Sequence, residues 1–228
     1  MLSASWPQRV RSPLTDRGSI ALLDSPPLIA TACLELAPQP LHQQIQQIAR
    51  QAIDRGDRRL VILPLFLLAG VHVRGDLPAE VKLAQQALGS AIELHLCSHL
   101  GSHPGLEKLL AQSFTEFPRS TARILLAHGS RRTLANREIA NLAQRLQAVS
   151  AYWSVAPSLS DRLQELTAAG HRQIAIVPYF LFAGGITDAI AQTVNELAAQ
   201  LPDCDLYLGE PLGATLELAD IAIDLLSR

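Results

Sequence analysis

A thirteen-residue segment occurs twice in this sequence, and the repeat constrains the fold more than any other feature. Residues 58–70, RRLVILPLFLLAG, and residues 172–184, RQIAIVPYFLFAG, share seven identical positions. Each segment is apolar on both faces, as strands are in a parallel sheet that helices cover on both sides. Chance is a poor explanation for this density of identity, so the sequence predicts two similar halves. A chain of 228 residues is long enough for two small domains.

The second half alternates strands with helices. Short apolar runs bounded by Gly, Pro or Ser predict strands, and apolar residues three and four positions apart predict helices. We expect strands at 122–130, 149–157, 172–182 and 204–209, and helices at 134–146, 158–170, 186–201 and 214–228. This order is typical of parallel βαβ units in an open sheet.

The first half repeats this order from residue 28 onward. Its expected strands are 28–36, 58–68 and 91–97, and its expected helices are 40–56, 77–88 and one that begins at 104. Residues 1–27 do not match the second half, where a strand ending in AHGS comes first. A polar stretch at 114–123 separates the halves. We therefore expect two tandem, flavodoxin-like α/β domains, 1–118 and 119–228, with helices on both faces and an atypical or missing first strand in the first domain.

Composition excludes several classes of partner. The net charge is only −2, with basic and acidic residues spread along the chain, so nothing predicts binding to nucleic acid or to an anionic membrane. No apolar run reaches the length of a membrane span, and the first residues lack the apolar core of a signal peptide. The cysteines Cys33, Cys97 and Cys204 form no CxxC pair and lie in apolar runs, which predicts buried thiols in the reducing cytosol.

Candidate site residues lie where strands end, because ligands of doubly wound sheets bind beyond the carboxyl ends of the strands. Glu35, His72 and His128 each end or follow a predicted strand, and His99 and His103 lie in the loop SHLGSHP. An imidazole and a carboxylate from neighbouring strands can bind a divalent first-row metal and also accept protons.

Each candidate also has a structural interpretation. A single histidine in a glycine-rich turn is more often a hydrogen-bonded structural residue, and HGS at 128–130 can be a tight turn whose serine caps a helix. Glu35 is harder to dismiss, because an unpaired carboxylate at the end of a buried strand is costly unless it faces a cleft or a partner.

Several of these segments together resemble the motifs of the sirohydrochlorin chelatases, small enzymes that insert Co²⁺ or Fe²⁺ into the macrocycle sirohydrochlorin. The resemblance covers residues 28–228 and is carried by ACLELAPQPLHQQI, ILPLFLLAGVHVRGDLP, SHLGSHPGL and LLAHGSRRTLANREIANLAQRL. The two halves are similar to the long members of the family, in which a short single-domain version appears duplicated. The resemblance thus implies a lyase in cobalamin or siroheme biosynthesis.

The resemblance also implies roles for individual residues. His72 matches the metal-binding histidine that follows the repeated strand, and Glu35 matches the strand-end glutamate; both are expected to be catalytic and to bind the metal. The histidine of the family's first GHGS motif has its counterpart in the second half, at His128, where Ser154 replaces the glutamate and GGITDAI shortens the loop that carries His72 in the first half. His128 is expected as a third metal ligand.

The remaining expectations concern the substrate and the assembly. The backbone of five consecutive residues is expected to pack on the macrocycle, and a cation to meet its carboxylates. The residues expected to bind the substrate are Leu67, Leu68, Ala69, Gly70, Val71 and Arg74, with Lys82 or another nearby residue as an alternative cation. No cofactor is expected beyond the substrate metal, and the fused halves predict a monomer.

Two other functions stay open at this point. The chain could be a non-catalytic metal- or tetrapyrrole-binding protein derived from a chelatase, since a first strand and its histidine are not recognisable in residues 1–27. A nucleotide-binding domain is disfavoured by the lack of a GxGxxG or GxxxxGK[ST] spacing. The same ligands suit several divalent ions, so the sequence does not select the metal.

Overall fold

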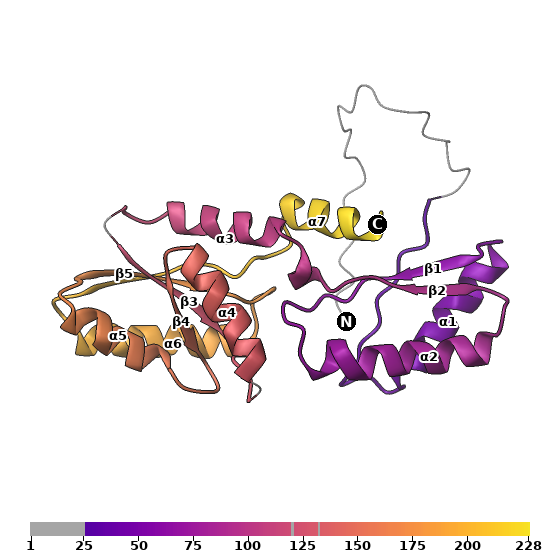
Figure 1. Cartoon of the computed structure of the whole chain (residues 1–228), viewed down its shortest axis with the longest axis horizontal. Helices are drawn as coiled ribbons and strands as arrows, with labels where there is room; N and C mark the ends of the chain where they lie inside the picture. The colour runs from indigo at the N-terminus through magenta and orange to yellow at the C-terminus, as the bar shows by residue number, and fades with distance from the viewer. Residues whose placement is uncertain (1–25, 120, 132) are drawn as a thin grey trace, which may run out of the picture. The chain divides into compact units, whose positions relative to one another are not determined.

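The computed structural model describes residues 26–119, 121–131 and 133–228 (Figure 1). The chain divides into two units, Met1–Thr31 and Ala32–Arg228, and every described helix and strand lies in the second unit. The expectation about a first strand within residues 1–25 lies outside the described residues.

The second half forms a four-stranded parallel sheet. Its strands are β3 (Ala122–Ala127), β4 (Val149–Tyr152), β5 (Gln173–Pro178) and β6 (Asp205–Leu208), arranged in the order β4-β3-β5-β6. The first two strands of this half lie in inverted order, as in flavodoxin-like sheets, so the chain changes direction across the sheet beside β3. The predicted parallel, doubly wound sheet is confirmed for this half.

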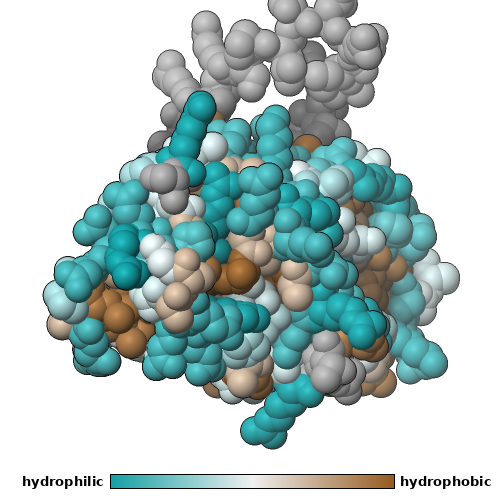
Figure 2. All heavy atoms as spheres, turned by 60° about the vertical axis from the view of Figure 1, so that its left-hand side comes forward, coloured by the Kyte–Doolittle hydropathy of each residue, from teal (hydrophilic) through white to brown (hydrophobic). Residues whose placement is uncertain are grey.

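Helices cover both faces of this sheet. They are α4 (Thr133–Arg145), α5 (Leu159–Ala168) and α6 (Gly185–Gln200). Side chains of α4 pack on one face, and those of α5 and α6 pack on the other. The outer side of this half, which Figure 2 brings forward, is mostly hydrophilic with small apolar patches, because the amphipathic helices turn their apolar sides to the sheet.

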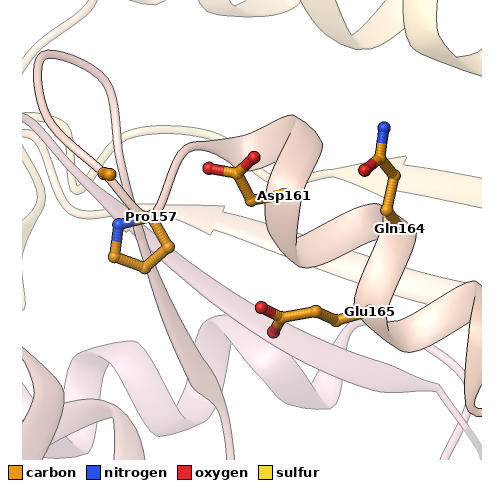
Figure 3. Close-up of a pocket in the computed structure, with 5 residues that line it drawn as sticks. Pro157, Asp161, Gln164 and Glu165 are labelled. Carbon is orange, nitrogen blue, oxygen red and sulfur yellow. The ribbon is translucent and has the colours of Figure 1, made fainter.

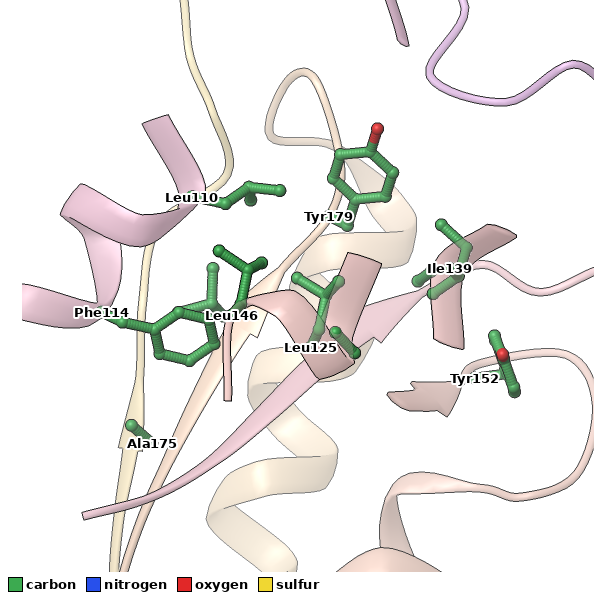
Figure 4. Packing of buried hydrophobic residues seen from close by; sticks show 11 residues of the cluster. Leu110, Phe114, Leu125, Ile139, Leu146, Tyr152, Ala175 and Tyr179 are labelled. Atoms are coloured by element: carbon green, nitrogen blue, oxygen red, sulfur yellow. The ribbon is translucent and has the colours of Figure 1, made fainter. Parts of the chain in front are cut away.

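A helix from the first half completes the core of the second (Figure 4). Helix α3 (Gly105–Thr115) places Leu110 and Phe114 against Leu125 of β3 and Leu146, which directly follows α4, and all four side chains are buried. The guanidinium of Arg123 also lies 5.3 Å from the centre of the Phe114 ring. Burial of a Leu or Phe side chain contributes about 1.5–3 kcal/mol, so α3 belongs energetically to the second sheet.

The last helix packs in the opposite direction. Helix α7 (Leu216–Leu226) buries Leu218, Ile221 and Leu225 against Leu100 and Leu106 of the first half. Leu100 begins a short 3₁₀ helix, η2 (Leu100–Ser102). Each half therefore supplies a helix to the other. The domain boundary at 118/119 stays a prediction.

The first half holds a two-stranded parallel sheet of β1 (Arg59–Ile62) and β2 (Glu93–Leu96). Helices α1 (Leu41–Asp54) and α2 (Leu77–Leu88) pack on it through Leu41, Ile45, Leu77, Val81 and Ala84. The π-helical turn η1 (His72–Asp76) leads directly into α2. No residue of 58–70 is helical, as the repeat predicted.

The register of the two sheets confirms the internal repeat. Arg59 pairs with Glu93 on β2, and Gln173, its counterpart in the repeat, pairs with Asp205 on β6. The hydrogen bond from Cys97 N to Ile62 O has its equivalent between Gly209 N and Ile176 O, both at 2.9 Å. The halves thus share the strand pair that follows the repeated segment.

The expected strand at 28–36 is wrong. Residues 28–33 have no regular structure and 34–39 form a series of bends. In the second half the equivalent strand, β4, pairs only with β3. Within the described residues the first sheet has no equivalent of β3, so this segment lacks a strand to pair with, and strand propensity alone does not order it. As a result Cys33 is exposed, contrary to expectation, whereas Cys97 and Cys204 are buried; all three are free thiols.

Candidate metal site

His72 lies at the start of the π-helical turn that follows the repeated strand. The turn is opened by the bond from Leu77 N to the His72 carbonyl, which spans five residues instead of the four of an α-helix. The ring is half exposed, and Phe66 lies beside it with ring centroids 6.1 Å apart. Its Nδ1 lies 2.8 Å from Asp76 Oδ2, while Nε2 lies 3.8 Å from Glu35 Oε1. The two nitrogens therefore face two different carboxylates.

Glu35 reaches this place without being in a strand. The side-chain amide of Gln44, on α1, accepts a hydrogen bond from Cys33 N at 3.0 Å and donates to Cys33 O at 2.9 Å and Gln39 O at 2.8 Å. These bonds replace the ladder that a neighbouring strand would supply. Leu36 turns the chain with a left-handed φ of 61°. The Glu35 side chain is mostly exposed.

The separation of Glu35 and His72 suits two ligands of one metal ion. Two donors about 2.1 Å from an ion, at the tetrahedral angle, are about 3.4 Å apart. The observed 3.8 Å between Nε2 and Oε1 is only slightly wider. It is too long for a hydrogen bond. A small closure of the loop that carries Glu35 is enough to bring both atoms to one ion.

His128 lies in the second half and is exposed at the end of β3. Its carbonyl accepts hydrogen bonds from Ser154 N at 2.9 Å and Ser154 Oγ at 2.8 Å. The next residue, Gly129, has φ of +82°, and a side chain there would collide with Tyr152, which favours the tight-turn interpretation of HGS. Across the described part of the chain, no three or more His, Cys, Asp and Glu side chains form a group able to hold a metal ion. A metal role for His128 stays a prediction.

A cleft of about 410 Å³ adjoins the turn η1: Ala69, three residues before His72, lines it, and Glu138 of its lining pairs with Arg74 of η1. Of the predicted substrate-binding residues, Leu67, Leu68 and Ala69 line it, whereas Gly70, Val71 and Arg74 are not in its lining. The cleft is also lined by polar residues of both halves, namely His99, Ser102, His103, Glu107, Glu138, Arg145 and Tyr179. Its floor joins the two copies of the repeat, because the Tyr179 hydroxyl donates to Leu67 O at 3.3 Å.

Charged residues at the cleft are already paired. Arg74 donates to Glu138 at 3.3 Å, and Arg145 donates to Glu107 at 2.8 Å. Burial raises the pKa of Tyr179, and the Glu138 carboxylate raises it further, so the phenol stays a hydrogen-bond donor at neutral pH. Exposed ion pairs such as Arg74–Glu138 contribute at most about 1 kcal/mol. A ligand carboxylate can therefore displace Glu138 at little cost.

The histidines of the SHLGSHP loop have structural partners. His99 Nδ1 lies 3.0 Å from Phe66 O, and His103 Nε2 lies 2.7 Å from Asp224 Oδ2 on α7. His103 Nδ1 also accepts a hydrogen bond from Gly105 N at 3.0 Å, at the start of α3. These contacts fix the wall of the cleft and the junction of α3 with α7.

A second, shallower pocket lies elsewhere on the second half (Figure 3). Asp161 and Glu165 project from α5 on the side of Pro157. Asp161 accepts a hydrogen bond from Ser158 N and caps the helix, which lowers its pKa, and Glu165 pairs with Arg162 at 2.5 Å. Helix capping and ion pairing therefore account for the two acids. The lining of the pocket contains neither histidine nor cysteine.

Two residues of the site were not anticipated from sequence. Asp76 lies four positions after His72, a spacing that brings side chains together on a helix and could have indicated the contact. Gln44 contacts the Glu35 loop only through the fold, and nothing in its sequence surroundings marks it. Among the residues that the structure describes, no helix is long and apolar enough to cross a membrane.

Comparison with known proteins places the chain in a family. The model of the CbiX family matches residues 24–117 and again 122–228. The sirohydrochlorin ferrochelatase of Priestia megaterium is 23% identical over 197 residues, which are 80% of this chain and 72% of the relative. The sirohydrochlorin cobaltochelatase of the same organism is 22% identical over 205 residues, covering 83% of this chain and 65% of the relative.

The fold has solved counterparts as well. A structure of SirB from Bacillus subtilis with Fe³⁺ superposes with a TM-score of 0.73 at 21% identity, covering 88% of this chain and 81% of that one. This likeness shows the two-halved α/β fold, as expected from the repeat. Since the family model matches both halves and so nearly the whole sequence, the chain belongs to the CbiX family.

Proposed function

We propose that the chain is a sirohydrochlorin chelatase, a lyase that inserts Co²⁺ or Fe²⁺ into sirohydrochlorin. The observation that carries the proposal is the approach of His72 Nε2 to Glu35 Oε1 at 3.8 Å beside a cleft. An imidazole and a carboxylate at this separation supply both a metal ligand and a proton acceptor. Membership of the CbiX family and the names of the two relatives support the same activity.

His72 and Glu35 divide the reaction between them. The metal ion is a substrate, and His72 Nε2 presents it to one face of the macrocycle. Insertion forms bonds between the metal and the pyrrole nitrogens, and two N–H protons leave. Glu35 accepts these protons or joins the coordination of the ion until it is transferred. Both side chains are partly exposed, so the ion can arrive from water and the protons can return to it.

The cleft receives the macrocycle. Leu67, Leu68 and Ala69 offer apolar contact to its flat face, and they precede His72 by only a few residues. Arg145 in the cleft lining, and Arg74 paired with Glu138 of that lining, can exchange Glu107 and Glu138 for carboxylates of the tetrapyrrole. When substrate binds, its carboxylates would replace Glu138 beside Arg74 and Glu107 beside Arg145. The proposal places the protein in the cytosol as a monomer, which its free thiols and fused halves support.

A spectrophotometric assay of metal insertion tests the proposal. His72→Ala is expected to abolish insertion of Co²⁺ and Fe²⁺ into sirohydrochlorin, whereas His128→Ala reduces it far less. Equal rates for the wild type and His72→Ala would contradict the assignment of His72. A wild type that binds metal or tetrapyrrole but inserts nothing would favour the binding protein over the enzyme.

A further inference from the structure

The two nitrogens of His72 have different surroundings, and only one of them makes a hydrogen bond. Nδ1 lies 2.8 Å from Asp76 Oδ2, and Nε2 lies 3.8 Å from Glu35 Oε1. A neutral imidazole carries one proton, on either nitrogen, and the nitrogen without the proton holds the lone pair that binds a metal. The partner of one nitrogen thereby decides what the other can do.

The π-helical turn explains why Asp76 reaches His72. Both residues lie in this turn, at its first and last positions. Single π-helical turns are rare and are frequently found at functional sites. Asp76 also precedes α2 without its side chain capping the helix, so its carboxylate is committed to the imidazole and not to the backbone.

We propose that Asp76 is a positioning residue that holds His72 in the tautomer protonated at Nδ1, with the Nε2 lone pair turned toward Glu35 and available to a divalent metal. Ionised carboxylates accept hydrogen bonds but cannot donate them, so the proton shared by this pair belongs to Nδ1. Carboxylates that hold metal-binding histidines in this way both orient the ring and raise its basicity. The inference rests on the proposed function in one respect, namely that His72 binds the metal ion.

The second half offers a matched control. Its loop GGITDAI carries Asp188 in the first turn of α6, and the histidine of the first half has no equivalent there. Asp188 is exposed, like Asp76. Asp188→Ala therefore removes a carboxylate from the start of an α-helix without touching a histidine. Either substitution loses about 0.3–1 kcal/mol of helix-dipole stabilisation, too little to unfold a domain.

The first test reads the tautomer directly, without metal or sirohydrochlorin. Long-range ¹H–¹⁵N correlation spectra of the labelled full chain are recorded at about pH 8, which favours neutral imidazole, and His72→Gln assigns the ring. We expect a protonated Nδ1 and a bare Nε2 in the wild type and in Asp188→Ala. Asp76→Ala is expected to move the proton toward Nε2, and Asp76→Asn, whose amide oxygen still accepts, to retain it on Nδ1.

The second test measures Co²⁺ binding by calorimetry on the same proteins. Loss of an outer partner of a metal-binding histidine typically weakens binding by about 10–100-fold, and we expect this for Asp76→Ala, with Asp188→Ala unchanged. A wild-type ring protonated at Nε2, or the same tautomer in wild type and Asp76→Ala, overturns the inference. A tautomer switch in a protein that inserts no metal would refute the proposed function alone, and insertion without the switch would refute the inference alone.

Discussion

The tightest backbone contact near the cleft is at Gly101, in the loop SHLGSHP. A Cβ atom at this position would lie 1.8 Å from Leu67 O and 2.4 Å from its carbonyl carbon. Real Cβ atoms essentially never come within 3.0 Å of another heavy atom, so Gly101→Ala would force the two backbones about 1.2 Å apart. Both atoms belong to main chains, and neither can rotate away.

The cost of this separation follows from the bonds that cross the contact. Gly101 N donates to Phe66 O at 2.9 Å, and Leu67 O accepts from the Tyr179 hydroxyl at 3.3 Å. Each bond contributes about 0.5–1.5 kcal/mol net, and overpacking adds about 1–3 kcal/mol. We expect Gly101→Ala to lower the free energy of unfolding by about 2–6 kcal/mol, the sum of the two bonds and the overpacking.

Urea denaturation followed by circular dichroism measures this loss. Gly185→Ala, at the start of α6, is the matched control, because a Cβ there has no atom within 4 Å and the backbone conformation suits alanine. If Gly101→Ala and Gly185→Ala unfold at the same denaturant concentration, the close approach of the 101 loop to the repeated strand is wrong. Because Leu67 lines the cleft, Gly101→Ala should also raise KM for sirohydrochlorin.

Three further outcomes are expected. Gln44→Ala frees the loop of Glu35 and should weaken Co²⁺ binding at least several-fold in calorimetry while the melting temperature changes little; unchanged binding would show that these bonds do not hold the carboxylate in place. Burial raises the pKa of Glu80, but hydrogen bonds from the backbone and ring of His42 outweigh this effect and lower the pKa below its ordinary 4.5. The ionised Glu80 therefore stabilises the folded state above about pH 4.5, and this contribution is lost on further acidification. Acid unfolding of Glu80→Gln should accordingly be less steep below pH 4.5 than that of wild type, and parallel curves would contradict the pairing. Phe114→Ala should cost about 3–5 kcal/mol of unfolding free energy in urea titration, and a loss below about 1 kcal/mol would show that α3 is not part of the second core.

Regular structure was predictable wherever local pattern and tertiary packing agree. Helix α2 occupies 77–88 as expected, and the repeated segment forms β1 and β5 at its start. The segment 28–36 has the composition of a strand but no strand beside it, and a single strand without a ladder leaves its backbone groups unpaired. The sequence pattern reflects the side chains of one strand and does not reveal whether an adjacent strand is present to pair with it.

The candidate site was predictable only in part, for a similar reason. Glu35 and His72 could be named because the ends of parallel strands meet at one edge of a sheet, and the structure brings them together although one of the strands is absent from the described residues. Asp76 and Gln44 act through hydrogen bonds whose geometry depends on the turn of η1 and on the approach of α1. His128, similar in sequence context, has its carbonyl hydrogen-bonded to Ser154, and its role as a metal ligand stays a prediction.

Because α3 packs on the second half and α7 on the first, the segment that is repeated in sequence is not the same as the segment that forms a complete hydrophobic core. A fragment ending near residue 118 would carry Leu110 and Phe114 away from the hydrophobic surface they fill, and its counterpart would carry off Leu218 and Ile221. Each fragment would then expose an apolar surface shaped for the other. The two halves of the fused chain therefore depend on each other for their hydrophobic cores, and cleavage between them would leave both cores incomplete.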